Sequence, residues 1–131
     1  MLYNPVPQTE VIFYRDNDGS TPVLAWLQGL RRGEQKAYAK CVVRIRELAQ
    51  LGHELRRPAA DVLRDGIHEL RARSGRVHYR ILYFFHGRTA AILAHGLTKE
   101  GAVPDAEIER ALVRKKRFQQ DPEGHSSYVD L

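Results

Sequence analysis

Two arginines stand inside apolar, strand-like segments of the chain, and their type and position point to anion chemistry. Arg71 occurs in IHELRAR and Arg80 in VHYRILYFF. A guanidinium cannot neutralise itself by losing a proton, so an apolar strand tolerates it only beside water or an anion. Its fork of donors matches phosphate oxygens, and its permanent charge can stabilise a phosphate that gains negative charge during cleavage. We therefore expect a negatively charged group to bind at these positions.

Both arginines also have a structural interpretation. Arg71 follows Glu69 by two residues, which places both side chains on one strand face, so they can form an ordinary charge pair. Arg80 has no acidic residue near it in the sequence, and its neighbours Tyr79 and Ile81 are apolar in character. The structural interpretation is therefore weaker for Arg80 than for Arg71.

A predicted three-stranded antiparallel meander positions these residues. Residues 77–86 alternate with the period of a β-strand, and residues 67–73 and 89–97 read as strands on either side. The connections at 74–76 and 86–88 are short and contain glycine, which is typical of hairpins. On the first of these strands the charged residues share one face and the apolar residues share the other, so we expect the apolar face to pack in the core.

The rest of the chain predicts an α+β fold of one domain. A strand at 10–15 precedes a helical hairpin that ends near Leu51 and can cover one sheet face. A basic connection at 52–66 leads into the meander, and a C-terminal helix follows from Asp105 to about Phe118. We expect residues 1–118 to form the single domain and residues 119–131 an acidic, flexible tail.

Composition and charge bound the function classes. The 131 residues are 43% hydrophobic and 28% charged, and no apolar run approaches the roughly 20 residues of a membrane helix. The first residues lack the basic start and apolar centre of a secretory signal, and Cys41 is the single cysteine. These features predict a cytoplasmic protein. The net charge of +5 favours phosphate-rich or acidic partners, although the positive charge of a basic domain can also serve only to keep its surface soluble.

The segment 63–111 resembles a known family. Its sequence, LRDGIHELRARSGRVHYRILYFFHGRTAAILAHGLTKEGAVPDAEIERA, is similar to toxins of the HigB/RelE superfamily, particularly the phage-associated HigB-like branch. In that branch a "dGl-x-ELR" strand, a "yRilYf" strand, an "LlhgFxKK" strand and a "tP-x-x-ei-x-x-A" helix follow one another at this spacing. The resemblance covers about residues 10–117.

The resemblance implies a RelE-like, microbial ribonuclease-type α+β fold and a function. Such a protein is the toxin of a type II toxin–antitoxin system and cleaves messenger RNA in the ribosomal A site, without a metal or organic cofactor. Its partner is a cognate antitoxin, commonly a helix-turn-helix DNA-binding protein, and operator DNA is bound only through that antitoxin. No membrane partner is implied.

The resemblance also assigns roles to residues. Arg80 stands at "yR" and Arg71 at "ELR", where they would stabilise the phosphorane. Lys99 occupies the first lysine of "KK", while Glu100 replaces the second and reverses one charge. His95 matches the "hg" histidine and could move a proton near neutral pH, but the general base stays unassigned.

A second group of residues could grip RNA. Tyr79 could stack on a nucleobase, with packing in the core as its alternative. Lys115 and Lys116 could contact phosphate, or could simply offset the dipole of the C-terminal helix. The candidate contacts are Arg64, Arg73, Arg76, Tyr79, Lys115 and Lys116.

Two rival functions remain open. One is a catalytically weak RNA-binding or phage accessory protein that keeps the toxin fold, which Glu100 motivates. The other is a regulatory module that chiefly binds its antitoxin.

Overall fold

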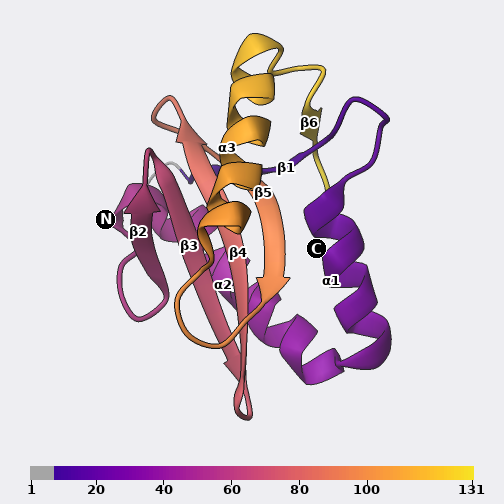
Figure 1. Cartoon of the computed structure of the whole chain (residues 1–131), viewed down its shortest axis with the longest axis vertical. Helices are drawn as coiled ribbons and strands as arrows, with labels where there is room; N and C mark the ends of the chain where they lie inside the picture. The colour runs from indigo at the N-terminus through magenta and orange to yellow at the C-terminus, as the bar shows by residue number, and fades with distance from the viewer. Residues whose placement is uncertain (1–7) are drawn as a thin grey trace, which may run out of the picture.

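A six-stranded mixed β-sheet forms the frame of the part of the chain that the structure, a computed structural model, describes, residues 8–131. The order across the sheet is β2-β3-β4-β5-β1-β6 (Figure 1). The strands are β1 (Glu10–Tyr14), β2 (Ala60–Arg64), β3 (Ile67–Ser74), β4 (Val77–His86), β5 (Ala90–Thr98) and β6 (Ser126–Ser127). The helices are α1 (Pro22–Gly33), α2 (Gln35–Leu51), the short 3₁₀ helix η1 (Gly52–Glu54) and α3 (Asp105–Gln120).

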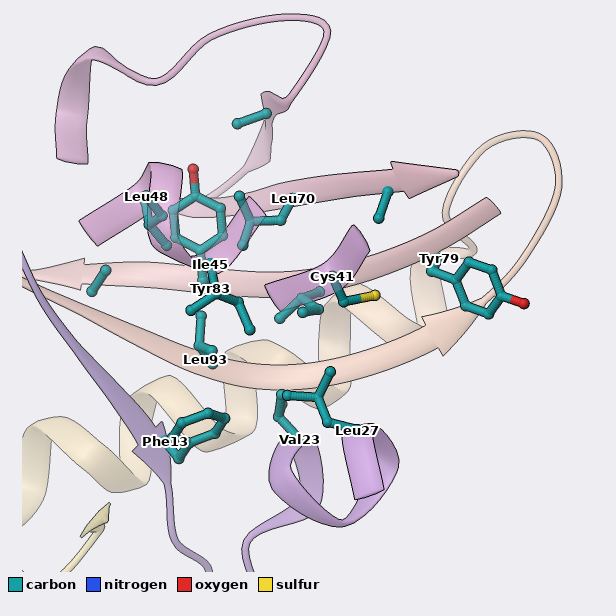
Figure 2. Close-up of a cluster of buried hydrophobic side chains, with 14 of the residues drawn as sticks. Phe13, Val23, Leu27, Cys41, Ile45, Leu48, Leu70, Tyr79, Tyr83 and Leu93 are labelled. Carbon is teal, nitrogen blue, oxygen red and sulfur yellow. The ribbon is translucent and has the colours of Figure 1, made fainter. Parts of the chain in front are cut away.

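Helices cover both faces of this sheet. The helical hairpin of α1 and α2 packs on one face, and α3 lies on the other (Figure 1). On the α1/α2 side, Leu70, Tyr83 and Leu93 from the strands meet Leu27 and Leu48 from the helices in a buried cluster (Figure 2). A second buried cluster lies under α3. Its members are Ile12, Tyr14, Ile67, Leu82, Phe84, Ala90, Ile92, Ala94, Ile108, Ala111 and Phe118. The fold is therefore α+β, as the sequence predicts.

The predicted meander is confirmed. β3, β4 and β5 pair antiparallel in sequence order. Gly75 and Gly87 lie in the two connecting turns with φ near +62°, a left-handed conformation that glycine adopts without strain. The predicted first strand is also present as β1, and it pairs with β5 in parallel, with Ile12 opposite Ile92.

The connection at 52–66 differs from the expected loop because it contains η1 and the edge strand β2. β2 pairs antiparallel with β3, with Ala60 opposite Leu70 and Asp61 opposite Glu69. Its five residues, ADVLR, are too few to show a clear period, so their sequence resembled a basic connection.

The C-terminal segment, expected to be a flexible tail, packs against the sheet in the structure. α3 continues to Gln120, and β6 then pairs with β1 at Phe13 and Tyr14. His125 is buried, donates a hydrogen bond from Nδ1 to the backbone carbonyl of Arg15, and stacks on Tyr14 with ring centroids 5.5 Å apart. These contacts involve residues about 110 positions apart, so the acidic composition of the segment does not reveal them.

None of the helices among residues 8–131 is long and apolar enough to cross a membrane. The first seven residues, on which the expected lack of a secretory signal largely rests, lie outside the described part of the chain.

Candidate functional site

Arg71 and Arg80 meet on the sheet face that carries α3. They lie directly opposite one another on β3 and β4. Their strand neighbours Leu70, Ala72 and Ile81 face the α1/α2 hairpin, so the two arginines face the other way. The β3–β4 hairpin extends beyond α3, and the loop that joins β5 to α3 passes in front of it (Figure 1). The two arginines that the sequence assigns to the phosphorane are therefore neighbours on one sheet face.

A buried carboxylate lies between them. Glu69 is only 2% exposed, accepts a short hydrogen bond from Arg71 Nε, and places Oε1 3.6 Å from Arg80 Nε. Asp61 on β2 adds a second carboxylate, with Oδ2 3.1 Å from Arg71 Nη2. The hydrogen bond that Arg71 donates to Glu69 raises the pKa of Arg71, although partial burial opposes this shift. The charge-pair interpretation of Arg71 therefore holds in this structure.

Arg71 nevertheless keeps a solvent-facing part. Its side chain is 38% exposed, whereas that of Arg80 is 11% exposed. Two carboxylates orient the Arg71 guanidinium without covering it. Arg71 can therefore reach an external anion.

Arg80 binds the backbone of the β5–α3 loop instead of facing open solvent. Its Nη1 donates to the carbonyl of Lys99 at 3.0 Å and to that of Gly101. Its Nε is buried without a hydrogen-bond acceptor, because 3.6 Å to Glu69 is too long for a hydrogen bond. In this structure Arg80 therefore contacts backbone carbonyls and the internal carboxylate of Glu69, and its binding of an external anion stays a prediction. Backbone carbonyls satisfy the guanidinium, and the sequence near Arg80 does not show them.

The contacts of Arg80 place Lys99 beside the hairpin. Lys99 is exposed, and its backbone N–H donates to the carbonyl of His78 at 3.2 Å. His78 lies opposite Arg73, one cross-strand pair further along the face that carries Arg71 and Arg80. We call Arg71, Arg73, His78 and Lys99 the hairpin basic surface.

Within this surface Arg73 is exposed and donates to Gly75 O at 2.9 Å. Two further charges flank the surface, and one of them is Arg76, which is exposed at the tip of the hairpin. Glu100, also exposed, follows Lys99 and leaves a negative charge at the edge. The hairpin basic surface therefore presents several cations to solvent, with Glu100 as a local opposing charge.

A β-bulge places His95 on the sheet face that also carries Arg71 and Arg80, at a position that α3 covers. The register between β4 and β5 shifts after Leu82, so that Ala94 and His95 both lie toward α3. His95 Nε2 makes a short hydrogen bond with Glu107, and Nδ1 lies 3.2 Å from Arg114 Nη1. These partners assign a neutral ring with its proton on Nε2. Burial lowers the pKa of His95, although Glu107 opposes that shift.

The remaining sequence-predicted contacts lie elsewhere. Arg64 pairs with Asp65, Asp105 and Glu109, which raises its pKa and ties β2 to α3. Lys115 donates to the backbone carbonyl of Asp65 at 2.9 Å, while Lys116 is exposed on α3.

Tyr79 is 6% exposed on the α1/α2 face, with its ring centroid 6.4 Å from that of Trp26. Tyr79 therefore packs in the core, which is the alternative that the sequence analysis gives for this residue. A tyrosine in this place does not meet a base bound on the opposite sheet face.

Sequence reasoning assigned no site role to Glu69 and overlooked Asp61. The signal for Glu69 was its position two residues before Arg71, but nothing local indicated that one carboxylate would approach both arginines. Asp61 is brought in by β2, the strand that the sequence did not reveal. Among residues 8–131 no group of three or more His, Cys, Asp or Glu side chains has the geometry to hold a metal ion.

A protein-family model described as "Phage derived protein Gp49-like (DUF891)" matches residues 25–116. This span begins in α1, includes β2 to β5 and ends in α3, so it contains the hairpin basic surface and the residues that organise it. No curated protein is a significant match to the chain.

Proposed function

The chain belongs to the Gp49-like family of phage-derived proteins, a toxin-like family of toxin–antitoxin systems, and on this premise we propose that it is a toxin that cleaves messenger RNA. The finer assignment is a ribosome-dependent endoribonuclease of HigB/RelE type, acting in a type II pair. Its reaction on translating ribosomes would take place in the cytoplasm.

The observation that carries the proposal is that part of the Arg71 side chain is exposed to solvent within a positively charged surface. Arg71, Arg73 and Lys99 lie on or beside one hairpin face, and α3 leaves the end of that hairpin uncovered (Figure 1). Buried Glu69 and partly exposed Asp61 fix the Arg71 guanidinium, so binding a phosphate costs little further side-chain ordering. This arrangement suits a scissile phosphate.

Cleavage of RNA without a metal needs four tasks: activation of the 2′-hydroxyl, its alignment with the phosphate, stabilisation of the phosphorane and protonation of the leaving 5′-oxygen. Arg71 and Lys99 supply positive charge for the phosphorane. Arg80 acts as a positioning residue, because it holds the loop that carries Lys99.

We assign proton transfer to His78 in place of His95. His78 is partly exposed on the same strand face as Arg80, whereas His95 is held by Glu107 and Arg114 under α3. A catalytic base must reach the proton that it abstracts, and His78 faces the surface where the phosphate would bind.

The proposed partners follow from this activity. Messenger RNA in the ribosomal A site is the substrate, and Arg76 at the hairpin tip together with Arg73 would contact its phosphates. A cognate antitoxin, of the helix-turn-helix DNA-binding kind, would neutralise the toxin and carry the pair to operator DNA.

The experiment is inducible expression followed by mapping of RNA 5′ ends on translated transcripts. The wild-type chain should arrest growth and create new ends within coding regions. Arg71→Ala should lower the number of new ends by about 100-fold, the usual effect of removing one preorganised charge from a transition state. Arg32→Gln, an exposed arginine at the end of α1, is the matched control and should cleave like wild type.

One observation favours a second candidate, a phage accessory protein that binds RNA without cutting it. Glu69 and Asp61 already compensate much of the charge of Arg71, and Arg80 is occupied by carbonyl groups. RNA binding by wild type that depends on Arg71 but yields no new ends, with or without ribosomes, would decide for this candidate.

A further inference from the structure

A cavity of about 500 Å³ lies on the sheet face opposite the hairpin basic surface. It opens near the edge strand β2, where η1 and the following loop pass over the ends of β3 and β4. The side chains that matter in its wall are His53, Arg56, Arg57, His68, Tyr83 and Phe85. Its volume is in the range of sites that hold small organic ligands.

Aromatic rings form one side of this cavity. The His53 ring stacks on Phe85, with centroids 3.7 Å apart and planes 19° apart. His68 stacks on Tyr83 at 5.2 Å and meets Phe85 edge-on at 5.1 Å. Tyr83 itself is anchored in the buried cluster with Leu48 and Leu70 (Figure 2). A planar ring that enters the cavity can therefore extend a preformed stack.

These rings are suited to an uncharged planar partner. Burial lowers the pKa of His68, and the nearby His53 and Lys115 lower it further. His68 is therefore neutral at pH 7. It presents an aromatic edge, and its ring nitrogens have no hydrogen-bond partner among residues 8–131.

Cations form the opposite side. Arg56 and Arg57 both line the cavity and are exposed. Arg57 is paired with Asp61 at 2.9 Å, but no carboxylate of the described residues lies within ion-pair distance of Arg56. An unpaired guanidinium at the rim is available to an anionic group, and phosphate oxygens match its geometry.

We propose that this cavity binds a nucleoside phosphate, with the base against the His53–Phe85 stack and the phosphate at Arg56. The aromatic rings can stack on any nucleobase, and the guanidinium groups bind the phosphate. A nucleotide therefore binds more tightly than a nucleoside or a sugar phosphate, each of which makes only one of these contacts. The nucleotide is either free or an unpaired residue of an RNA chain. The cavity is linked to the hairpin basic surface through one residue, because Asp61 lines the cavity and also binds Arg71, but this proposal does not depend on the nuclease proposal.

The test is titration of the full chain with the four nucleoside 5′-monophosphates, followed by NMR of the aromatic side chains and by calorimetry. At least one nucleotide should bind with a dissociation constant of about 1 mM or tighter. The resonances of His53, His68 and Phe85 should shift. The matching nucleoside and ribose 5-phosphate should each bind at least about fivefold more weakly.

Variants separate the two halves of the site. His53→Ala, a change at an exposed ring, should weaken nucleotide binding about fivefold, and Phe85→Leu at least as much. Arg56→Gln should weaken binding of the nucleotide but not of the nucleoside. Arg32→Gln should bind like wild type.

A trinucleotide distinguishes the two sources. If the trinucleotide binds at least tenfold more tightly than the mononucleotide, and His53→Ala abolishes that binding, the site is assigned to RNA. If the gain in affinity is smaller than tenfold, the site is assigned to a free nucleotide. The proposal is overturned if no nucleotide or trinucleotide shifts these resonances at about 10 mM, or if Arg56→Gln and His53→Ala bind as wild type does. Because no cleavage is measured, these outcomes leave the nuclease test untouched.

Discussion

Arg71 on β3 lies directly opposite Arg80 on β4, so the sheet holds two guanidinium groups next to each other on one face. Like charges in this position destabilise a strand pair. The compensating charge near both arginines is the buried Glu69, which accepts from Arg71 and lies 3.6 Å from Arg80, while Asp61 adds a second carboxylate at Arg71 alone. The site therefore depends on a carboxylate that never needs to touch the substrate.

Glu69→Gln should lower the free energy of unfolding by about 3 kcal/mol, because it leaves two partly buried cations without their shared anion. Urea denaturation monitored by circular dichroism measures this. Glu100→Gln, at an exposed position beside the same surface, is the control and should change stability by less than about 0.5 kcal/mol. Equal stability of the two variants would show that Glu69 does not hold the pair.

Arg80→Lys should release the loop that begins at Lys99 while keeping the charge. A lysine ammonium lacks the planar fork that reaches the carbonyls of Lys99 and Gly101 together. Hydrogen exchange at the Lys99 amide, which donates to His78 O, should quicken at least about tenfold.

Arg73→Lys makes the same chemical change on the neighbouring pair and should leave the exchange of that amide unchanged. Unaltered protection in Arg80→Lys would mean that the loop is held by other contacts, and the positioning role of Arg80 would have to be abandoned.

Gly96 lies against the indole of Trp26, and a side chain there should be costly. A Cβ at this position would lie 2.5 Å from Trp26 Cδ2, so Gly96→Ala forces the ring or the strand to move. We expect a loss of about 1–3 kcal/mol, measured by chemical denaturation.

Gly29→Ala provides the contrast, since it lies inside α1 with no atom within 4 Å of the added Cβ. It should stabilise the protein by about 0.5–1 kcal/mol. A neutral Gly96→Ala would contradict the tight packing of α1 on β5.

His95 should make stability depend on pH. Because burial lowers its pKa in the folded state, the unfolded chain binds the proton more readily, and protonation favours unfolding. The stabilising contribution is complete above the unfolded pKa of about 6.5 and is lost as pH falls from about 7 toward 5.

Unfolding free energies of wild type and His95→Gln at pH 8, 7, 6 and 5.5 measure this effect. The difference between them should change with pH below 7 and be constant from 7 to 8, with a shallower decline for the variant. A constant difference over the whole range would disprove the shift. The other titrating groups are common to both proteins, so they cancel in the comparison.

The parts of the fold that the sequence predicted are those with a local signal. The meander has strict alternation and glycine-containing turns, and the helices have apolar spacing of about 3.6 residues. β2 is followed by the Asp65-Gly66 turn that joins it to β3, but its five residues show no clear period. β6 has only two residues and is held by pairing with β1, which is distant in the sequence and leaves no mark in the strand itself.

The same distinction applies to the candidate site. Alternation placed Glu69, Arg71 and Arg73 on one face of β3, and the pairing of β3 with β4, which alternation does not give, brings Arg80 to the same face. The groups that satisfy them come from Asp61 on β2 and from backbone carbonyls 19 and 21 residues after Arg80, so the sequence could not show which arginine stays open. The bulge after Leu82 shifts the alternation of β5 by one residue and brings His95 to the face of the two arginines, but Glu107 and Arg114 of α3 hold it there, which the strand sequence does not show.

The position of β1 has a consequence for synthesis of the chain. β1 pairs only with β5 and β6 among the described residues, and both come from the last 42 positions of the sequence. While the polypeptide emerges from the ribosome, the apolar stretch EVIFY has no strand partner until β5 has been synthesised. The sheet therefore closes around β1 only after that point, and premature termination before residue 90 yields a fragment with an unprotected, aggregation-prone strand.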